Sequence, residues 1–517
     1  MDDLIVNVKI WDRIVGALIW DKNKNVASFQ FEPKFLRAGL DVSPIVMPLK
    51  KSGRDIVYQF LGNRNECFKG LPGLIADSLP DKYGNEIINE WFAAHGLTGE
   101  EITPLDRLCY VGSRGMGALE FVPDKDIKEL NVSSRLHMEE LTALADKVFN
   151  DRVNFREKLL QEDKLILDIL KIGTSAGGAK PKAIIALNEE TKEVRSGQVK
   201  APDGFTYWLL KFDGTEYSEH DQKLKNPKGI GNIEYAYYRM AIDTGIKMME
   251  SRLLPERDNF HFMTKRFDRL DDGGKLHVQS LAAMEHWDMD TRHSYEEAFG
   301  TMRKLKLEYP QHEDFYRRMV FNVVSRNHDD HTKNHVFLMD KSGKWSLGPA
   351  YDLCYSYVPG GQWTNSHQMS LNGKRDDFTY DDLITVGERV GIVAPGETIE
   401  KVVDVVSRWK EYAKDCGVRE AHLDLINKNL RLLTKRPVLG YEGSPEKKSL
   451  VDLEISIVKK DMNYFVLPKI NGEPLLMERI SASEYKDFQL GKLSKEDIFQ
   501  KHYPDYSEEN IKNGRGR

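Results

Sequence analysis

Polar and apolar residues alternate at the beginning of the chain, in Leu4 to Ile10 and again in Val15 to Trp20. A period of two is typical of a strand with one buried face. The run Ala118 to Val122 predicts another strand. Gly112 to Gly117, just before it, resembles a phosphate-binding loop but is explained as well by a sharp turn, which we favour. The pattern predicts a small β-rich module over residues 1–125.

The middle of the chain mixes helical and strand patterns. Asn154 to Ile172 predicts a helix with a buried face and Asn154 as its N-cap. Ala183 to Leu187 and Tyr207 to Phe212 are apolar runs typical of buried strands. Residues 233–240 then return to a helical pattern. This stretch therefore predicts a second region in which strands and helices are mixed.

Beyond residue 310 the apolar spacing is helical. A first predicted helix carries four apolar residues along one face: Phe315, Met319, Val320 and Val323. Residues 398–412 and 421–433 repeat the spacing of amphipathic helices. The pattern predicts a helical carboxy-terminal lobe.

A change of composition marks the last part of the chain. Pro437, Gly440, Gly443 and Pro445 predict a linker. Further on, Asn471-Gly472 is the signal of a tight hairpin, and residues 494–502 predict a short helix. We expect a linker and a small extension over residues 437–517, and we infer no activity for it.

Residues 327–334, Asn-His-Asp-Asp-His-Thr-Lys-Asn, place an acid and an amide in one polar loop. Phosphoryl transfer needs a carboxylate that accepts or orients the proton of the nucleophile, and an amide that can hold magnesium. Asp329 and Asn334 fit these two roles, although a plain helix-to-strand turn explains the octapeptide equally well. Asp352, after the strand-like run Val336 to Met339, stands where a kinase carries another metal ligand.

Three weaker signals precede this loop in the chain. The glycine- and alanine-rich segment 172–182 could form an anion-binding nest, although such a segment is most often an ordinary turn. Lys211 lies in an apolar strand, as the phosphate-pairing lysine of a kinase does, and Glu234 on the next helix could be its ion-pair partner. A solvent-facing Lys and Glu are the ordinary alternatives. The order of all these signals along the chain is the order that a kinase requires.

Together the motifs resemble those of the HipA-family serine/threonine kinases, the toxins of bacterial toxin–antitoxin pairs. The motifs that carry the resemblance are, in chain order, Gly70 to Gly73, Asp77 to Gly84, Gly177 to Ala183, Lys265 to Arg269, Ser280 to Ala283, Asp329 to Asn334 and Pro349 to Asp352. The resemblance implies an α+β, protein-kinase-like fold of two lobes with an amino-terminal β-rich subdomain. It implies a kinase amino-terminal lobe over residues 126–275 and a helical catalytic lobe over residues 276–436.

The resemblance also implies the cofactors ATP and Mg²⁺ and a set of site residues. Asp329 would be the catalytic base, Asn334 and Asp352 the magnesium ligands, and residues 279–282 the hinge beside the adenine. The ATP-binding residues that it implies are Ala176, Gly177, Gly178, Ala179, Lys182, Lys211, Tyr351 and His331. Ser175 would be the autophosphorylated residue that switches the kinase off, with Thr174 as the adjacent alternative acceptor.

Charge, cysteine spacing and the apolar runs exclude some binding partners and classes of site. The net charge of −6 argues against a chain that coats nucleic acid by itself, so DNA contact is expected only through a partner. The four cysteines form no metal-ligand spacing. His328, His331 and His335 could share a zinc ion, but no His-Glu-x-x-His pattern accompanies them, which leaves a hydrolase a weak alternative. The start of the chain and its lack of long apolar runs predict a cytoplasmic protein without membrane contact.

We therefore predict a protein serine/threonine kinase toxin that arrests growth by phosphorylating a cytosolic protein. The family resemblance points to an aminoacyl-tRNA synthetase as a target and to a HipB-like helix-turn-helix antitoxin as a partner. A small-molecule kinase and a non-catalytic co-repressor scaffold for a DNA-binding antitoxin are the alternatives. The presence of Lys211, Asp329, Asn334 and Asp352 argues against the scaffold, because an idle kinase fold usually lacks at least one of them.

Overall fold

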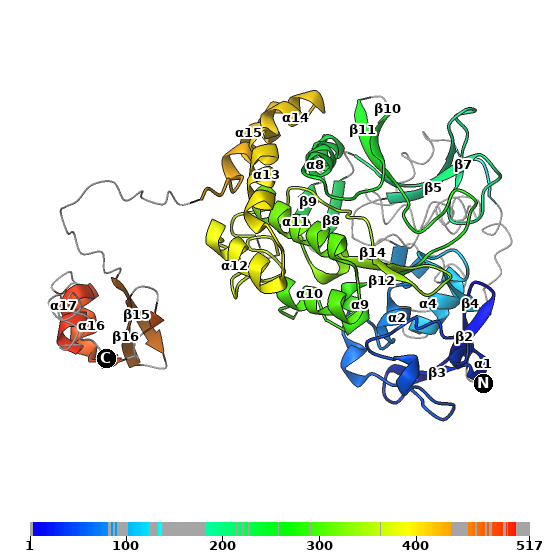
Figure 1. The fold of residues 1–517 in the computed structure, drawn as a ribbon, viewed down its shortest axis with the longest axis horizontal. Coiled ribbons are helices and arrows are strands. Elements are labelled where there is room, and N and C mark those ends of the chain that lie inside the picture. Colours follow the sequence, from blue (N-terminus) through cyan, green and yellow to red (C-terminus); the bar gives the residue numbers. More distant parts are fainter. Residues whose placement is uncertain are drawn as a thin grey trace. The chain divides into compact units, whose positions relative to one another are not determined.

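The computed structural model describes most of the chain, and the predicted α+β class is confirmed (Figure 1). The described residues are 4–80, 84–85, 88–89, 92, 102–123, 133–136, 182–213, 216–219, 222–225, 228–256, 258–289, 291–361, 363–435, 453–460, 463–470, 473–474, 478–489, 493 and 495–502. They form two compact units, Met1–Arg436 and Pro437–Arg517. The predicted helix at 154–172 lies outside the described residues.

The amino-terminal module is an antiparallel sheet with strand order β3-β2-β1-β4. Its strands are β1 (Ile5–Ile10), β2 (Arg13–Asp21), β3 (Val26–Phe31) and β4 (Leu119–Val122). Along β1 every second side chain, Val6, Val8 and Ile10, is buried, as the period of two predicts. The short helices α1 (Pro33–Leu36), α2 (Gly73–Ala76) and α4 (Pro104–Val111) belong to the same module. The β-rich module is therefore confirmed.

A five-stranded antiparallel sheet follows, in the order β10-β11-β7-β5-β6. Its strands are β5 (Lys182–Asn188), β6 (Val194–Ser196), β7 (Phe205–Lys211), β10 (Ser251–Glu256) and β11 (Asn259–Lys265). The hairpin of β8 (Glu216–Glu219) and β9 (Gln222–Lys225) leads from β7 to helix α8 (Ile230–Thr244), which packs on β10 and β11. The two predicted strands and the predicted helix of this region are confirmed.

The rest of the first unit is mainly helical. Its helices are α9 (Leu281–Glu285), α10 (Tyr295–Lys304), α11 (Tyr309–Ser325), α12 (Tyr380–Val390), α13 (Pro395–Ser407), α14 (Trp409–Asp415) and α15 (Glu420–Asn429). A three-stranded sheet, β12 (His277–Ser280), β13 (Val336–Met339) and β14 (Trp345–Leu347), lies among them. The polar loop that contains Asp329 joins α11 to β13.

Two predicted helix boundaries are wrong. The helix expected over 398–412 is divided into α13 and α14 at Arg408, because the fully buried Trp409 donates its indole N–H to the Leu423 carbonyl at 3.0 Å. The helix expected to reach residue 433 ends at Asn429, because the Arg431 N–H donates to the Val324 carbonyl at 2.9 Å. In both cases a contact distant in sequence outweighs a helical pattern.

The second unit is a small sheet with two helices. Its elements are β15 (Leu453–Lys460), β16 (Asn463–Ile470), β17 (Glu473–Pro474), β18 (Glu478–Ile480), α16 (Ala482–Gln489) and α17 (Lys495–His502). Ile470 pairs with Glu473, so the predicted Asn-Gly hairpin is confirmed. Strand β15 and helix α16 were not predicted. Across all described residues, no helix has the length and apolar character needed to cross a bilayer.

One hydrophobic core joins the amino-terminal sheet to the helical region. Helices α2 and α9 meet so closely that a Cβ on Gly73 would lie 2.3 Å from the Ala283 carbonyl oxygen. At this contact the Gly73 N–H donates to Nε2 of His286 at 2.8 Å, and Nδ1 of His286 lies 3.2 Å from Nδ2 of Asn63. A neutral imidazole is therefore built into the junction.

This histidine makes stability depend on pH. Burial lowers the pKa of His286 to about 4, below the value of about 6.5 for an exposed histidine. The unfolded chain binds the proton first, so the free energy of unfolding is expected to fall as pH decreases from about 6.5 to about 4. His286→Gln should reduce this slope by roughly 1.4 kcal/mol per pH unit, measured by urea unfolding at several pH values. Equal slopes for the original protein and His286→Gln would show that His286 does not cause the pH dependence.

Candidate active site

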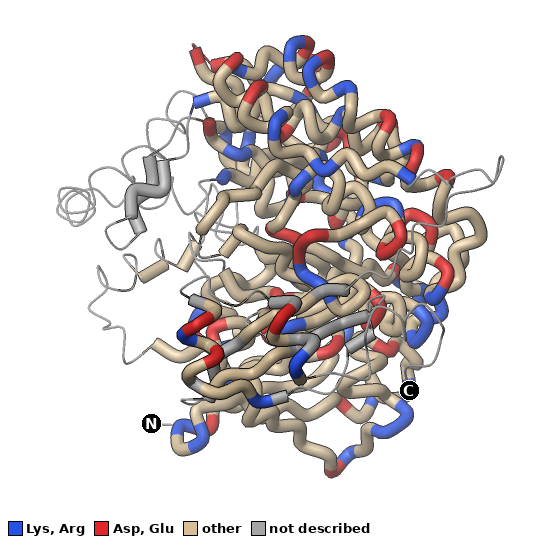
Figure 2. Tube along the Cα trace, turned by 90° about the vertical axis from the view of Figure 1, so that its left-hand side faces the viewer, with Lys and Arg blue, Asp and Glu red and all other residues tan. Residues whose placement is uncertain are grey.

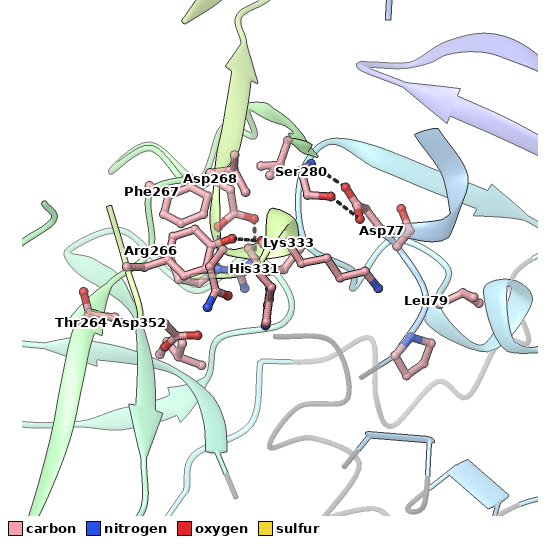
Figure 3. Close-up of a pocket in the computed structure, with 18 of the residues that line it drawn as sticks. Asp77, Leu79, Thr264, Arg266, Phe267, Asp268, Ser280, His331, Lys333 and Asp352 are labelled. Atoms are coloured by element: carbon pink, nitrogen blue, oxygen red, sulfur yellow. Dashed lines mark hydrogen bonds and ion pairs between the residues drawn. The ribbon is translucent and has the colours of Figure 1, made fainter. Parts of the chain in front are cut away.

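A cavity of about 870 Å³ is bounded by the five-stranded sheet, the helical region and the amino-terminal module (Figure 3). Its lining comes from segments far apart in the sequence, including β7, α8, β11 and the loop after α11. The predicted site residues that line it are Lys211, Glu234, Asp329, His331, Asn334, Tyr351 and Asp352. The fold thus brings most of the candidate set to one place.

Lys211, the last residue of β7, is the centre of a charge cluster. Its Nζ lies 2.5 Å from Oε1 of Glu234 and also donates to Oδ1 of Asp352. Burial alone lowers the pKa of Lys211, but the two carboxylates outweigh burial and raise the pKa above its usual value. Lys211 is therefore a permanent cation in the cavity wall, and the predicted partner Glu234 is beside it.

A carboxylate just after Lys211 determines the position of Glu234. Oδ1 of Asp213 accepts the N–H groups of Gly229 and Ile230, both at 2.9 Å, at the start of α8. An anionic acceptor there satisfies N–H groups that have no partner within the helix. Asp213 therefore holds α8 against the strand that carries Lys211. Asp213 was not among the predicted site residues; its only signal in the sequence is an acid directly after an apolar strand.

Asp329 is held through its backbone. Its N–H donates to Oγ of Ser356 at 2.9 Å, and its carbonyl accepts from Nδ2 of Asn334 at 2.7 Å. Its side chain is 53% exposed, and Oδ1 lies 3.7 Å from Nε2 of His331. The loop thus fixes the position of Asp329 and leaves its carboxylate accessible to an acceptor hydroxyl.

Asp330, the next residue, has the opposite environment. Its buried carboxylate accepts from the Tyr295 hydroxyl at 2.7 Å and from the Gln368 N–H at 2.7 Å, and lies 2.9 Å from Nδ1 of His367. Burial alone would raise the pKa of Asp330, but His367 and these hydrogen bonds lower it. Asp330 is thus a buried anion that organises the loop. No local signal distinguished it from Asp329.

Asp352 follows a short segment tied to the region after α8. The Ala350 N–H donates to the Lys247 carbonyl at 2.8 Å. Asp352 itself adopts a left-handed conformation with φ 53°, which Asp tolerates better than most residues. The hydroxyl of Tyr351 donates to the Lys333 carbonyl at 2.5 Å, and its ring lies 5.7 Å from the ring of Phe267. Tyr351 therefore links the Asp352 segment to the Asp329 loop.

The donor chemistry of the cavity fits magnesium. Asn334 and Asp352 supply an amide oxygen and a carboxylate, which are hard oxygen ligands. Nowhere in the described part of the chain do three His, Cys, Asp or Glu side chains group so that they could hold a metal alone. The zinc alternative at His328, His331 and His335, all of which are described, is therefore wrong. A magnesium ion here would need further oxygens from phosphates.

Lys182 is the one remaining predicted site residue that the structure describes. Lys182 begins β5 opposite Lys211 and is buried, but it is absent from the described residues that line the cavity. Residues 174–179, with Ser175 and the glycine-rich loop, lie outside the described residues.

The adenine hinge expected near residues 279–282 stays a prediction, and two backbone N–H groups there are already engaged by protein acceptors. The Ser280 and Leu281 N–H groups already donate to Oδ2 of Asp77 at 2.6 Å and to the His335 carbonyl at 2.7 Å. β12 pairs with β13, so the chain has crossed between the two sheets before residue 277. The crossing begins directly after β11, where Arg266 and Phe267 line the cavity.

The amino-terminal module forms one wall of the cavity. Besides the Ser280 N–H, Asp77 accepts the Ser280 hydroxyl at 2.9 Å, and Nζ of Lys333 donates to the Cys67 carbonyl at 3.3 Å. In Figure 3 the Lys333 side chain extends toward the side of Asp77 and Leu79. Burial raises the pKa of Asp77. In the sequence Asp77 is only one residue of a motif, and its role depends on contacts that the sequence does not show.

A buried charge network links residues 112–117, the turn before β4, with the crossing segment, residues 266–269 after β11. Oδ2 of Asp268 lies 2.6 Å from Nη2 of Arg266 and 2.7 Å from Nη1 of Arg269, and it accepts the Gly117 N–H at 2.8 Å. Arg269 also donates to the carbonyls of Gly115 and Gly117. These groups are engaged by protein, so the interpretation of this segment as a turn is confirmed.

Family models match both parts of the first unit. A model described as the HipA N-terminal domain matches residues 6–122, and a model described as the HipA-like C-terminal domain matches residues 174–430. A Haemophilus influenzae protein provisionally named a kinase is 22% identical over 357 residues, which cover 62% of this chain and 97% of that protein. A Sinorhizobium fredii protein, also provisionally named a kinase, is 24% identical over 244 residues, which cover 43% of this chain and 56% of that protein.

A solved structure shares the fold. It is the complex of HipA, HipB and operator DNA from the toxin–antitoxin system of Shewanella oneidensis, with TM-score 0.54 and 16% identity over 82% of this chain and 94% of that chain. The motifs, the two family models and the shared fold agree. The chain therefore belongs to the HipA family, and its fold is the two-lobed, kinase-like α+β fold of that family.

Proposed function

We propose that this HipA-family kinase is an ATP- and magnesium-dependent protein serine/threonine kinase that acts as a growth-arresting toxin. The observation that carries the proposal is the convergence of Lys211, Glu234 and Asp352 with Asp329 and Asn334 on one cavity. A phosphoryl-transfer site needs a fixed cation, metal-binding oxygens and a proton acceptor, and these residues supply all three.

Each residue has a defined part in the proposed reaction. Bound ATP with Mg²⁺ would supply the phosphoryl group. Lys211 would pair with phosphate oxygens, and Asn334 and Asp352 would hold the metal. Asp329 would accept the proton of a Ser or Thr hydroxyl while the oxygen of that hydroxyl bonds to the γ-phosphorus. The bond from that phosphorus to the bridging oxygen breaks, and ADP leaves.

Relatives and charge support the partners that we propose. The Shewanella oneidensis protein was solved with HipB and operator DNA, so we assign a HipB-like antitoxin to this chain as well. Basic and acidic residues are interspersed along the chain, and the net charge is −6 (Figure 2). We therefore expect DNA contact only through the antitoxin. The proposed substrate is a cytoplasmic protein, with an aminoacyl-tRNA synthetase as the first to test.

Asp329→Asn should abolish phosphoryl transfer and leave the fold intact, because the amide keeps the shape but accepts no proton. The expected loss is roughly 10²- to 10⁴-fold in the rate of transfer from labelled ATP to protein in a cell lysate. Near-normal turnover by the variant would remove Asp329 from the mechanism.

Asp330→Asn is the matched comparison for stability. The change removes the negative charge that the Tyr295 hydroxyl, the Gln368 N–H and His367 contact. The free energy of unfolding should therefore fall by about 3 kcal/mol in urea denaturation. Asp329→Asn should unfold like the original protein, because the Asp329 side chain is 53% exposed. Equal stability of the two variants would show that the neighbouring acids do not divide the two roles.

Asp352→Ala should weaken magnesium-dependent ATP binding, because Asn334 alone offers no negative charge to a hard dication. We expect a loss of roughly tenfold to a hundredfold by calorimetry, with Asp404→Ala, an exposed acid on α13, as the control. Unchanged affinity would mean that the metal binds elsewhere.

Autophosphorylation of the glycine-rich loop is the proposed means of control. A phosphate on Ser175, or on Thr174 beside it, adds about −1.5 to −2 charges at pH 7 and would repel the phosphates of ATP. Incubation with ATP should add one phosphate there and lower nucleotide affinity, while Ser175→Ala should stay active. Mass spectrometry with nucleotide titration checks this; full ATP binding by the modified form would refute the mechanism.

A further inference from the structure

A loop at the mouth of the cavity is fastened to the two acids after α11. We call residues 356–368 the rim loop; the structure describes all of them except residue 362. At one end, Oγ of Ser356 accepts the Asp329 N–H at 2.9 Å. At the other end, the Gln368 N–H donates to Oδ1 of Asp330 at 2.7 Å. The position of the rim loop is thus coupled to the proposed catalytic base.

The rim loop exposes two large apolar side chains. Trp363 is 65% exposed and Val358 is 53% exposed, and Trp363 is the only tryptophan among the exposed large apolar residues of the described chain. Both side chains belong to a turn that is held by internal hydrogen bonds. The Val358 N–H donates to the Thr364 carbonyl at 3.3 Å, and the Gly361 N–H to the Val358 carbonyl at 2.9 Å. The Gly360 N–H donates to Oδ1 of Asn365 at 2.7 Å.

Trp363 also lines the cavity that contains Asp329. It comes from the rim loop, whereas Lys211, which would meet the nucleotide phosphates, comes from the five-stranded sheet. The loop that carries the indole is also the one that bonds the Asp329 N–H through Ser356, which favours a place beside the proposed base. Exposing so large an apolar surface is unfavourable in water, and covering it on binding is a common source of affinity.

We propose that Trp363, together with Val358, recognises a large apolar side chain beside the phosphoacceptor Ser or Thr of a protein substrate. This inference rests on the proposed function and adds a specificity determinant to it. A small acceptor confined to the cavity would leave most of an indole that is 65% exposed uncovered. A polypeptide that brings a Ser or Thr hydroxyl to Asp329 has to cross the rim loop. The side chain next to that Ser or Thr can then cover the Trp363 ring.

The test uses the full chain, Mg²⁺-ATP and a library of peptides with a fixed central Ser or Thr and varied flanking positions. The original protein should select aromatic or large aliphatic residues at one flanking position. Two peptides are then compared that carry either the apolar residue or Gly at this position and are otherwise identical. The ratio of kcat/KM for the apolar peptide to kcat/KM for the Gly peptide should be roughly tenfold or more. Trp363→Ala should bring this ratio close to one. The Gly peptide is the internal reference for each variant, so a general loss of activity does not imitate the effect.

Two further variants sharpen the result. Trp363→Phe keeps an aromatic surface and should retain most of the selection. Val393→Ala removes another exposed apolar side chain, 82% exposed and absent from the described residues that line the cavity, and should leave the ratio unchanged. If Trp363→Ala does not fold, Val358→Ala serves in its place and should lower the ratio.

The outcomes separate the two proposals. An unchanged ratio in Trp363→Ala, an equal loss in Val393→Ala, or no apolar selection by the original protein would overturn the role of Trp363 while leaving the kinase proposal standing. If the original protein hydrolyses ATP but labels neither peptides nor proteins, the protein-kinase function itself fails.

Discussion

The ion pairs of Lys211 are the interaction on which the site depends. One ammonium group contacts a carboxylate from α8 and another from the segment after β14, so a strand, a helix and a loop are fixed relative to each other. Removing charges from water is costly, and a buried ion pair often adds little net stability. The arrangement fits the proposed function, because it presents a permanent cation and a carboxylate at the same cavity wall.

A second group of polar contacts holds the proposed base. Asp330 gathers the Tyr295 hydroxyl, His367 and the Gln368 N–H around one buried carboxylate, which fixes the loop from behind. Asp329 in front is thereby held through its backbone while its side chain stays accessible. In the proposed mechanism the two adjacent acids divide structure and chemistry between them. The Asp330–Gln368 hydrogen bond extends to the rim loop, so the proposed substrate contacts and the proposed base share one support.

The amino-terminal module is part of the site as well as a neighbour of it. Asp268 bonds the Gly117 N–H of that module while it pairs with two arginines of the crossing segment, and Asp77 bonds Ser280 at the end of β12. Separating the module from the rest of the first unit would break these buried hydrogen bonds and leave their polar groups without partners, at a large cost in free energy. One hydrophobic core also passes through both.

The sequence by itself determined the strands and helices with strong periodicity and the order of Lys211, Glu234, Asp329, Asn334 and Asp352 along the chain. Periodicity and the composition of polar loops are local properties, so they can be read without a structure. The glycine-rich turn before β4 and the Asn-Gly hairpin were predictable for the same reason.

Only the tertiary structure decided which acids are buried, where the chain crosses between the sheets and where α13 and α15 end. Periodicity and local composition assign no role to Asp213, Asp330 or Asp77, although the last two lie in motifs shared with the family. Their roles come from partners that are distant along the chain, such as Tyr295 for Asp330 and Ser280 for Asp77. Burial and pairing are set by the packing of the whole chain, and for that reason no local pattern could have identified them.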